Sequence, residues 1–103
     1  MNFGNMGNMM KQAQQMQARM AKLKEELAAR ECEASAGGGA VSVTASGDMQ
    51  LKKVLLSPEL LKDADAGMIQ DLIQTAANQA LAKAQELAAA EMSKITGGFK
   101  LPF

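Results

Sequence analysis

The feature that most restricts the fold is a run of apolar residues near the start, spaced alternately three and four apart. That spacing is a heptad pattern, which places an apolar stripe along one side of a helix. We call this stripe the apolar seam; it consists of Met6, Met9, Ala13, Met16, Met20, Leu23 and Leu27. No Gly or Pro interrupts residues 8–36. The pattern predicts a helix from about Asn8, a good N-cap residue, to Ala29, with its seam packed against a partner surface.

Beyond the helix the apolar period changes from that of a helix to that of a strand. Apolar and polar residues alternate weakly over 32–36 and clearly over 41–46, and a third segment over 49–56 has two Lys near its middle. Gly37-Gly38-Gly39 and Gly47-Asp48 separate the segments, and both are typical turn sequences. Three strands joined by short turns predict an antiparallel meander.

The last part of the chain is expected to be helical. Ser57 followed by Pro58 is typical of a helix start, and Asp65 can cap a longer helix after an interruption at 63–67. Gly97-Gly98 is expected to end that helix. Its apolar face is predicted to consist of Ile69, Leu72, Ile73, Ala76, Ala80, Ala84, Leu87, Ala88 and Ile95.

These elements fit a single α+β domain over residues 1–103, in which 1–7 and 97–103 are expected to be flexible. A helix of about 22 residues is roughly 33 Å long, whereas strands of this length span only about 20 Å. The sheet can therefore cover only part of the first helix, and Met9, Met16 and Met20 would overhang it. Monomers rarely tolerate such a bare stripe, so we expect a homodimer.

The residues needed for most enzyme chemistry are missing. The chain has no His and a single Cys, Cys32, which removes the usual acid–base group, an intrachain disulfide and a thiolate metal site. The Gly triplet at 37–39 is not followed by the Lys-Ser/Thr of a phosphate loop. We therefore expect no catalytic residue, metal, cofactor or small-molecule substrate. No apolar run approaches the roughly 20 residues of a membrane span.

The charge is concentrated although the net charge is zero. Residues 1–24 contain no acid and four cations, which are Lys11, Arg19, Lys22 and Lys24. No aromatic residues alternate with them, which favours contact with the duplex backbone over base stacking. Two interpretations stay open, a phosphate-binding face and an ordinary solvated face. The Met residues likewise fit a packing seam or a promiscuous peptide groove.

The order and spacing of several short segments along the chain together give it a family resemblance. They are Gly7 to Gln17, Gly39 to Val43, Val54 to Leu61, Asp71-Leu72-Ile73, Ala76 to Ala80 and Gly98 to Phe103. Together they run almost from end to end, and the chain resembles the YbaB/EbfC family of bacterial nucleoid-associated proteins.

The resemblance implies an α+β protomer in a tweezer-like homodimer with projecting helices, and no catalytic activity. It implies binding to double-stranded DNA in the cytoplasm, on the nucleoid. The family's DNA contacts are assigned to the projecting helices, which correspond here to Lys11, Arg19, Lys22 and Lys24, and more weakly to Lys83 and Lys94. The chain departs from the family where residues 76–90 are Ala-rich with one Lys. The alternative is a protein-interaction adapter for recombination or replication proteins, favoured by the neutral net charge and the Met surface.

Overall fold

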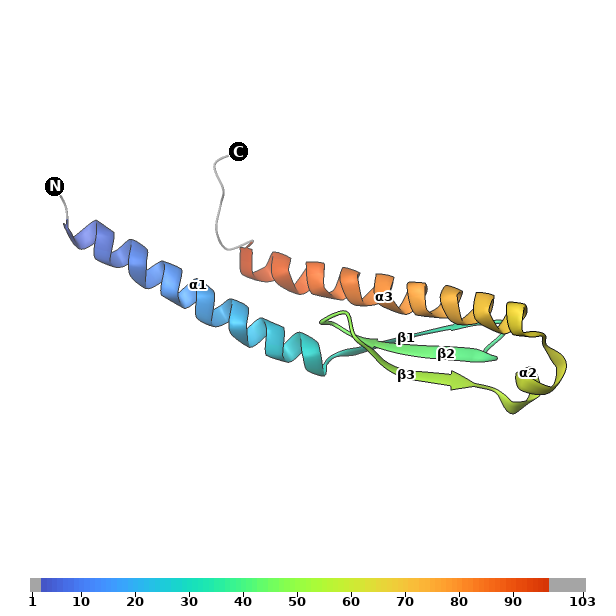
Figure 1. The fold of residues 1–103 in the computed structure, drawn as a ribbon. Coiled ribbons are helices and arrows are strands. Elements are labelled where there is room, and N and C mark those ends of the chain that lie inside the picture. Colours follow the sequence, from blue (N-terminus) through green and yellow to red (C-terminus); the bar gives the residue numbers. More distant parts are fainter. Residues whose placement is uncertain (1–2, 97–103) are drawn as a thin grey trace, which may run out of the picture.

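The computed structural model describes residues 3–96, an α+β chain in which one long helix projects from a sheet-and-helix body (Figure 1). The molecule is elongated, with principal extents of 75 × 26 × 16 Å. Its elements are α1 (Phe3–Ala29), β1 (Glu31–Ala36), β2 (Val41–Ser46), β3 (Leu51–Leu56), α2 (Pro58–Asp63) and α3 (Ala66–Thr96). The predicted fold class and the order of its elements are confirmed.

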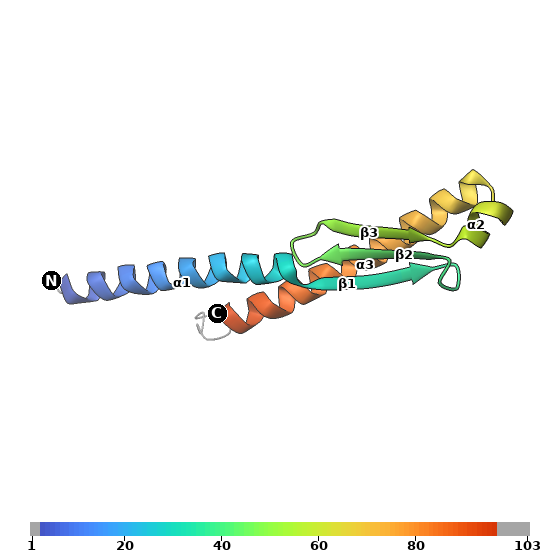
Figure 2. The ribbon, with the colours of Figure 1, turned by 90° about the horizontal axis from the view of Figure 1, so that it is seen from below.

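The three strands form the predicted antiparallel meander, in the order β1-β2-β3. Val41 lies opposite Ala36 on one side and Leu56 on the other. Alternate residues of β2, Val41, Val43 and Ala45, are completely buried, so the period of two in the sequence marks the core face. α3 packs mainly on β1 and β2 (Figure 2). β1 and β3 are the two edge strands of the sheet, and β3 is the strand that α3 contacts least.

The core of the body is built from small side chains. Ala76, Ala80 and Ala84 of α3 are completely buried against β2 and β1. Their spacing of four places them on one side of the helix. Alanines at these positions let the helix backbone approach the sheet closely, and close packing supplies the contacts that large side chains would otherwise make. Larger residues such as Leu72 and Ile73 are partly buried around this contact.

The connection between β2 and β3 is longer than the sequence suggested. The strand expected from Met49 begins at Leu51, so that boundary was wrong. Met49 adopts a left-handed backbone conformation (φ 67°) and donates its N–H to Ser46 O at 2.9 Å. The N–H of Ser46 in turn donates to Gln50 O at 2.8 Å. These hydrogen bonds hold Met49 in the turn rather than in the strand.

Both C-terminal helices begin with the caps that the sequence predicts. Ser57 Oγ accepts a hydrogen bond from Leu60 N at 3.2 Å, and Pro58 occupies the first turn of α2. Asp65 Oδ1 accepts from Met68 N at 2.7 Å at the start of α3. Each cap satisfies a backbone N–H that lacks a partner within its helix.

The start of α1 differs from the prediction, whereas its end does not. α1 begins at Phe3 instead of Asn8, and it ends at Ala29 as expected. The glycines before Asn8 do not stop the helix, because an exposed helical Gly costs only about 1 kcal/mol relative to Ala. The helix stop at 97–98 and the flexible tail expected at 97–103 lie outside the described residues.

α1 is joined to the body at a tight contact near its C-terminus. Leu23 and Leu27 are buried there. The N–H of Gly47, in the turn after β2, donates to Leu27 O at 2.9 Å and to Arg30 O at 3.0 Å. A Cβ at Gly47 would lie 2.7 Å from Leu27 O, so only glycine allows this approach. We call this contact the α1 joint.

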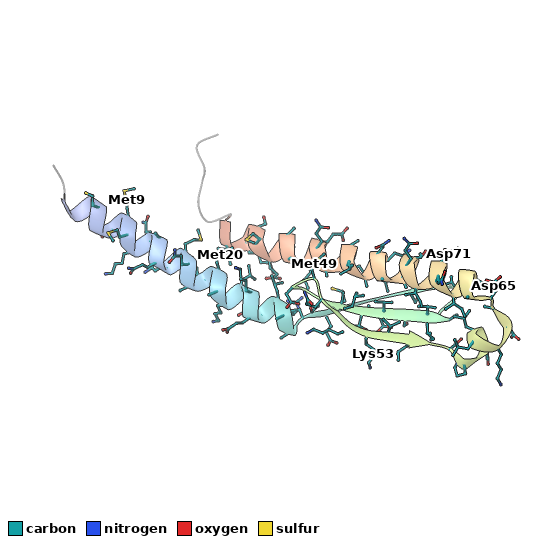
Figure 3. All side chains as sticks on the ribbon, in the orientation of Figure 1. Met9, Met20, Met49, Lys53, Asp65 and Asp71 are labelled. Atoms are coloured by element: carbon teal, nitrogen blue, oxygen red, sulfur yellow. The ribbon has the colours of Figure 1, made fainter. Side chains whose placement is uncertain are left out.

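The apolar seam is covered at one end and bare at the other. Leu23 and Leu27 are buried, Met16 and Met20 are half-buried, and Ala13 is exposed. Met9, near the free end of α1 (Figure 3), has 68% of its surface exposed. The predicted overhang is therefore confirmed at Met9. It was wrong for Met16 and Met20, which are half-buried.

Candidate nucleic-acid interface

A groove between α1 and the end of α3 collects cationic side chains from both helices. In Figure 1 the C-terminal half of α1 runs beside the last turns of α3, while the N-terminal half extends past them. The groove has a volume of about 200 Å³. We call it the basic groove; it is lined by Arg19, Lys22, Leu23 and Glu26 of α1 and by Glu91, Lys94 and Ile95 of α3.

Helical spacing explains why these side chains meet. Arg19 and Lys22 are three residues apart on α1, and Glu91 and Lys94 are three apart on α3, so each pair shares one side of its helix. Leu23, which is buried, also lines the groove. The apolar contact that fixes α1 against α3 therefore also determines where the cations lie.

Glu91 pairs with cations on both of its sides. Its Oε1 lies 3.2 Å from Lys94 Nζ and 3.8 Å from a guanidinium nitrogen of Arg30. The Glu91 side chain is 23% exposed, against 55% for Arg30 and 73% for Lys94. Pairs with such exposed partners add little to stability, so these cations can also interact with a ligand.

The six cations assigned to DNA by resemblance do not form one cluster. Arg19, Lys22 and Lys94 come together at the basic groove. Lys11 and Lys24 are exposed on α1 and do not line it. Lys83 lies on the body, where its Nζ donates a hydrogen bond to the backbone oxygen of Glu33 at 2.8 Å. Their contacts with DNA stay predictions.

The sequence did not identify three residues of this region, which are Glu26 and Glu91 in the groove and Arg30 beside it. The spacing of Glu91 and Lys94 is a visible signal, since an acid and a Lys three residues apart on a helix interact. No local signal relates Arg30 to α3, because the contact depends on how α1 meets the body.

The rest of the described chain offers little for catalysis or metal binding. No group of three or more His, Cys, Asp or Glu side chains within residues 3–96 could hold a metal ion. Cys32 is a half-buried free thiol. It borders a hollow of about 380 Å³ with Glu33 and Lys53, and the chain has no His to act as its base. Within the same residues, none of the helices combines the length and apolarity needed to cross a bilayer.

The fold is shared with a solved bacterial protein. The crystal structure of an uncharacterized protein from Helicobacter pylori matches with a TM-score of 0.74, covering 92% of this chain and 97% of that one, at 22% identity. At that identity the likeness establishes the α+β architecture alone.

Sequence comparison defines the class more closely, as a DNA-binding one. The model of the YbaB/EbfC DNA-binding family matches residues 1–99. A nucleoid-associated protein of Moorella thermoacetica is 51% identical over 102 residues, which are 99% of this chain and 98% of that protein. A nucleoid-associated protein of Acetivibrio thermocellus is 52% identical over 95 residues, covering 92% and 84%. The chain belongs to the YbaB/EbfC DNA-binding family, as its resemblance implied.

Proposed function

We propose that this protein is a nucleoid-associated homodimer that binds double-stranded DNA with little sequence specificity, in the cytoplasm, and so organises the chromosome or regulates expression. The observation that carries the proposal is the basic groove, where Arg19 and Lys22 of α1 lie beside Lys94 of α3. Side chains from two helices at one groove suit contact with successive phosphates. Lys11 and Lys24 extend the positive surface along α1. Lys83, on the body, makes a weaker contact with the DNA.

Low specificity follows from the kinds of side chain available. Lys and Arg on the outside of a helix neutralise phosphates whatever the base sequence. The chain has no Trp or Tyr, and among the described residues that line the basic groove none is aromatic, so these residues offer no platform for base stacking. Affinity should therefore depend steeply on salt and weakly on base sequence.

The homodimer is supported by apolar surface left uncovered on the single chain. Met6, Met9 and Met10 of α1 are 60–68% exposed. Leu51, Val54 and Leu55 of β3 are 44–55% exposed. A second copy would cover such surface and would bring two basic grooves to one duplex. If each protomer contacted three or four phosphates, the total of about six to eight would give strong salt dependence.

The test compares two triple variants of equal charge. Arg19→Gln, Lys22→Gln and Lys94→Gln together should weaken binding to a duplex by at least tenfold at low salt and flatten the salt dependence. Lys52→Gln, Lys53→Gln and Lys62→Gln remove the same charge from β3 and α2 and should leave most of the affinity. Fluorescence anisotropy with a labelled duplex at several salt concentrations measures both. Equal loss in the two variants would refute the assignment to the groove.

The second candidate function is an adapter for recombination or replication proteins, favoured by the exposed Met6, Met9 and Met10. Adaptable Met-rich surfaces suit protein partners. An adapter would retain such a partner through nuclease treatment and high salt, and its DNA affinity would vary little with salt.

A further inference from the structure

Glu91 pairs with Lys94, the cation that α3 contributes to the basic groove, and with Arg30, which follows α1. We propose that Glu91 competes internally with DNA phosphate for Lys94 and Arg30 and thereby lowers the protein's affinity for DNA. This inference rests on the proposed function of the groove and adds a residue that limits it.

The geometry of Glu91 is that of a group occupying a phosphate's place. Its carboxylate oxygen lies within ion-pair distance of both cations, 3.2 Å from Lys94 Nζ and 3.8 Å from the Arg30 guanidinium, and an anionic phosphate oxygen would be attracted to the same two groups. The carboxylate is 23% exposed, while both cations reach further into solvent. A phosphate can therefore approach the cations from outside while Glu91 holds them from within.

The local charge balance makes the effect large for one residue. Three cationic and two acidic side chains line the groove, so its net charge is only +1. Removing Glu91 would double that charge at the surface where the phosphates approach. It would also release Lys94, whose pairing with Glu91 follows from a separation of three residues on α3.

Released cations leave a thermodynamic signature. A Lys already paired with a carboxylate displaces fewer counterions from DNA on binding than an unpaired one. Neutralising one additional phosphate steepens the slope of log K against log salt by about 0.9. A purely structural role for Glu91 would change the melting temperature and leave this slope alone.

The experiment measures duplex affinity against salt for Glu91→Gln and for Glu86→Gln, a matched control. Glu86 is exposed on the same helix and does not line the groove. From the Coulomb energy of charges a few ångströms apart near a surface, Glu91→Gln should raise affinity about three- to tenfold at low salt. Glu86→Gln should raise it by less than twofold. The slope of log K against log salt should steepen only in Glu91→Gln, by about 0.9 for each basic groove that contacts the DNA.

A double-variant cycle identifies the cation involved. In a Lys94→Gln background, Glu91→Gln should lose most of its gain, because the cation it releases is missing. If Glu91→Gln binds no more tightly than the original protein, or more weakly, the inference is wrong while the proposed function stands. If no variant binds DNA, Glu91→Gln included, both are overturned. Circular dichroism melting of each variant shows that the folded protein is being compared.

Discussion

The body and the projecting helix of this molecule are held by different means. In the body, small side chains of α3 and β2 are completely buried, with Ala76, Ala80 and Ala84 against Val41 and Val43. α1 is fixed to that body mainly by two buried leucines and the hydrogen bonds of Gly47. The body therefore has its own core, whereas the position of α1 depends on a few contacts at one end.

This difference bears directly on binding. The basic groove has one wall on each part, since Arg19 and Lys22 lie on α1 and Lys94 on α3. Stability is thus concentrated in the body, while the geometry of the proposed binding surface is set at the α1 joint. Four substitutions separate these roles, and their expected effects decrease in the order given.

The largest effect is expected for Ala80→Asp in the body. Ala80 is completely buried between α3 and the sheet, so a carboxylate there has neither water nor a partner. The cost should be about 4 kcal/mol or more, a large part of the roughly 5–15 kcal/mol that stabilises a typical domain. Thermal unfolding by circular dichroism should show a protein that is unfolded or nearly so.

Ala82→Asp is the control on the same helix. Ala82 is exposed, so only helix propensity is lost, about 0.7 kcal/mol or less. If both variants melted alike, the alanine contact would not be the core of the body.

A smaller effect is expected for Gly47→Ala, which alters the α1 joint. The new Cβ would lie 2.7 Å from Leu27 O and 3.0 Å from the Leu27 side chain. Because the obstacle is backbone, α1 must shift, at a cost of about 1–3 kcal/mol. DNA affinity should fall although no charge changes, because Arg19 and Lys22 move relative to Lys94. Melting and anisotropy measure the two effects, and a variant that kept full affinity would contradict this account of the joint.

Met9→Gln concerns the free end of α1. Met9 is 68% exposed in the single chain, so the melting of an isolated protomer should barely change. If a second copy covers the seam, burial of this side chain stabilises the dimer, and the substitution should weaken association by about tenfold or more. Sedimentation equilibrium measures this. Met10 is 65% exposed and lies outside the seam. Met10→Gln should therefore leave association intact, and equal weakening by both substitutions would argue against a seam contact.

Gly7→Ala should have the smallest effect and the opposite sign. Gly7 lies within α1 with nothing within 4 Å of the position of a Cβ. The alanine should stabilise the helix by about 1 kcal/mol or less. A rise in helicity, seen by circular dichroism at low temperature, checks it. Destabilisation here would mean that another chain approaches Gly7 closely.

Local patterns predicted most of the fold. The alternation of Val41, Val43 and Ala45 marked the buried face of β2, and Ser57 and Asp65 became the caps expected of them. These features depend on residues a few positions apart, where spacing and side-chain chemistry decide the outcome. The start of α1 was predicted wrongly because Asn8 is a good N-cap residue, whereas the helix continues through it and begins at Phe3. No strong stop signal separates these two positions.

The candidate site was less predictable. The sequence identified Arg19 and Lys22 as cations on one helix, and only family resemblance added Lys94. Their meeting at one groove depends on the direction in which α1 leaves the body. That direction is set by contacts such as Gly47 with Leu27, which are remote in sequence. The role of Glu91 depends on the same tertiary contact.

The elongated shape has a consequence for hydrodynamic measurements. A compact domain of this length would have a radius of gyration of about 13 Å, whereas this chain has 20.4 Å. Its frictional coefficient is correspondingly high for a mass of 10.9 kDa. One chain alone should therefore elute early from a gel-filtration column, at an apparent mass well above its own. Light scattering, which weighs particles regardless of their shape, would distinguish a slowly diffusing single chain from a pair.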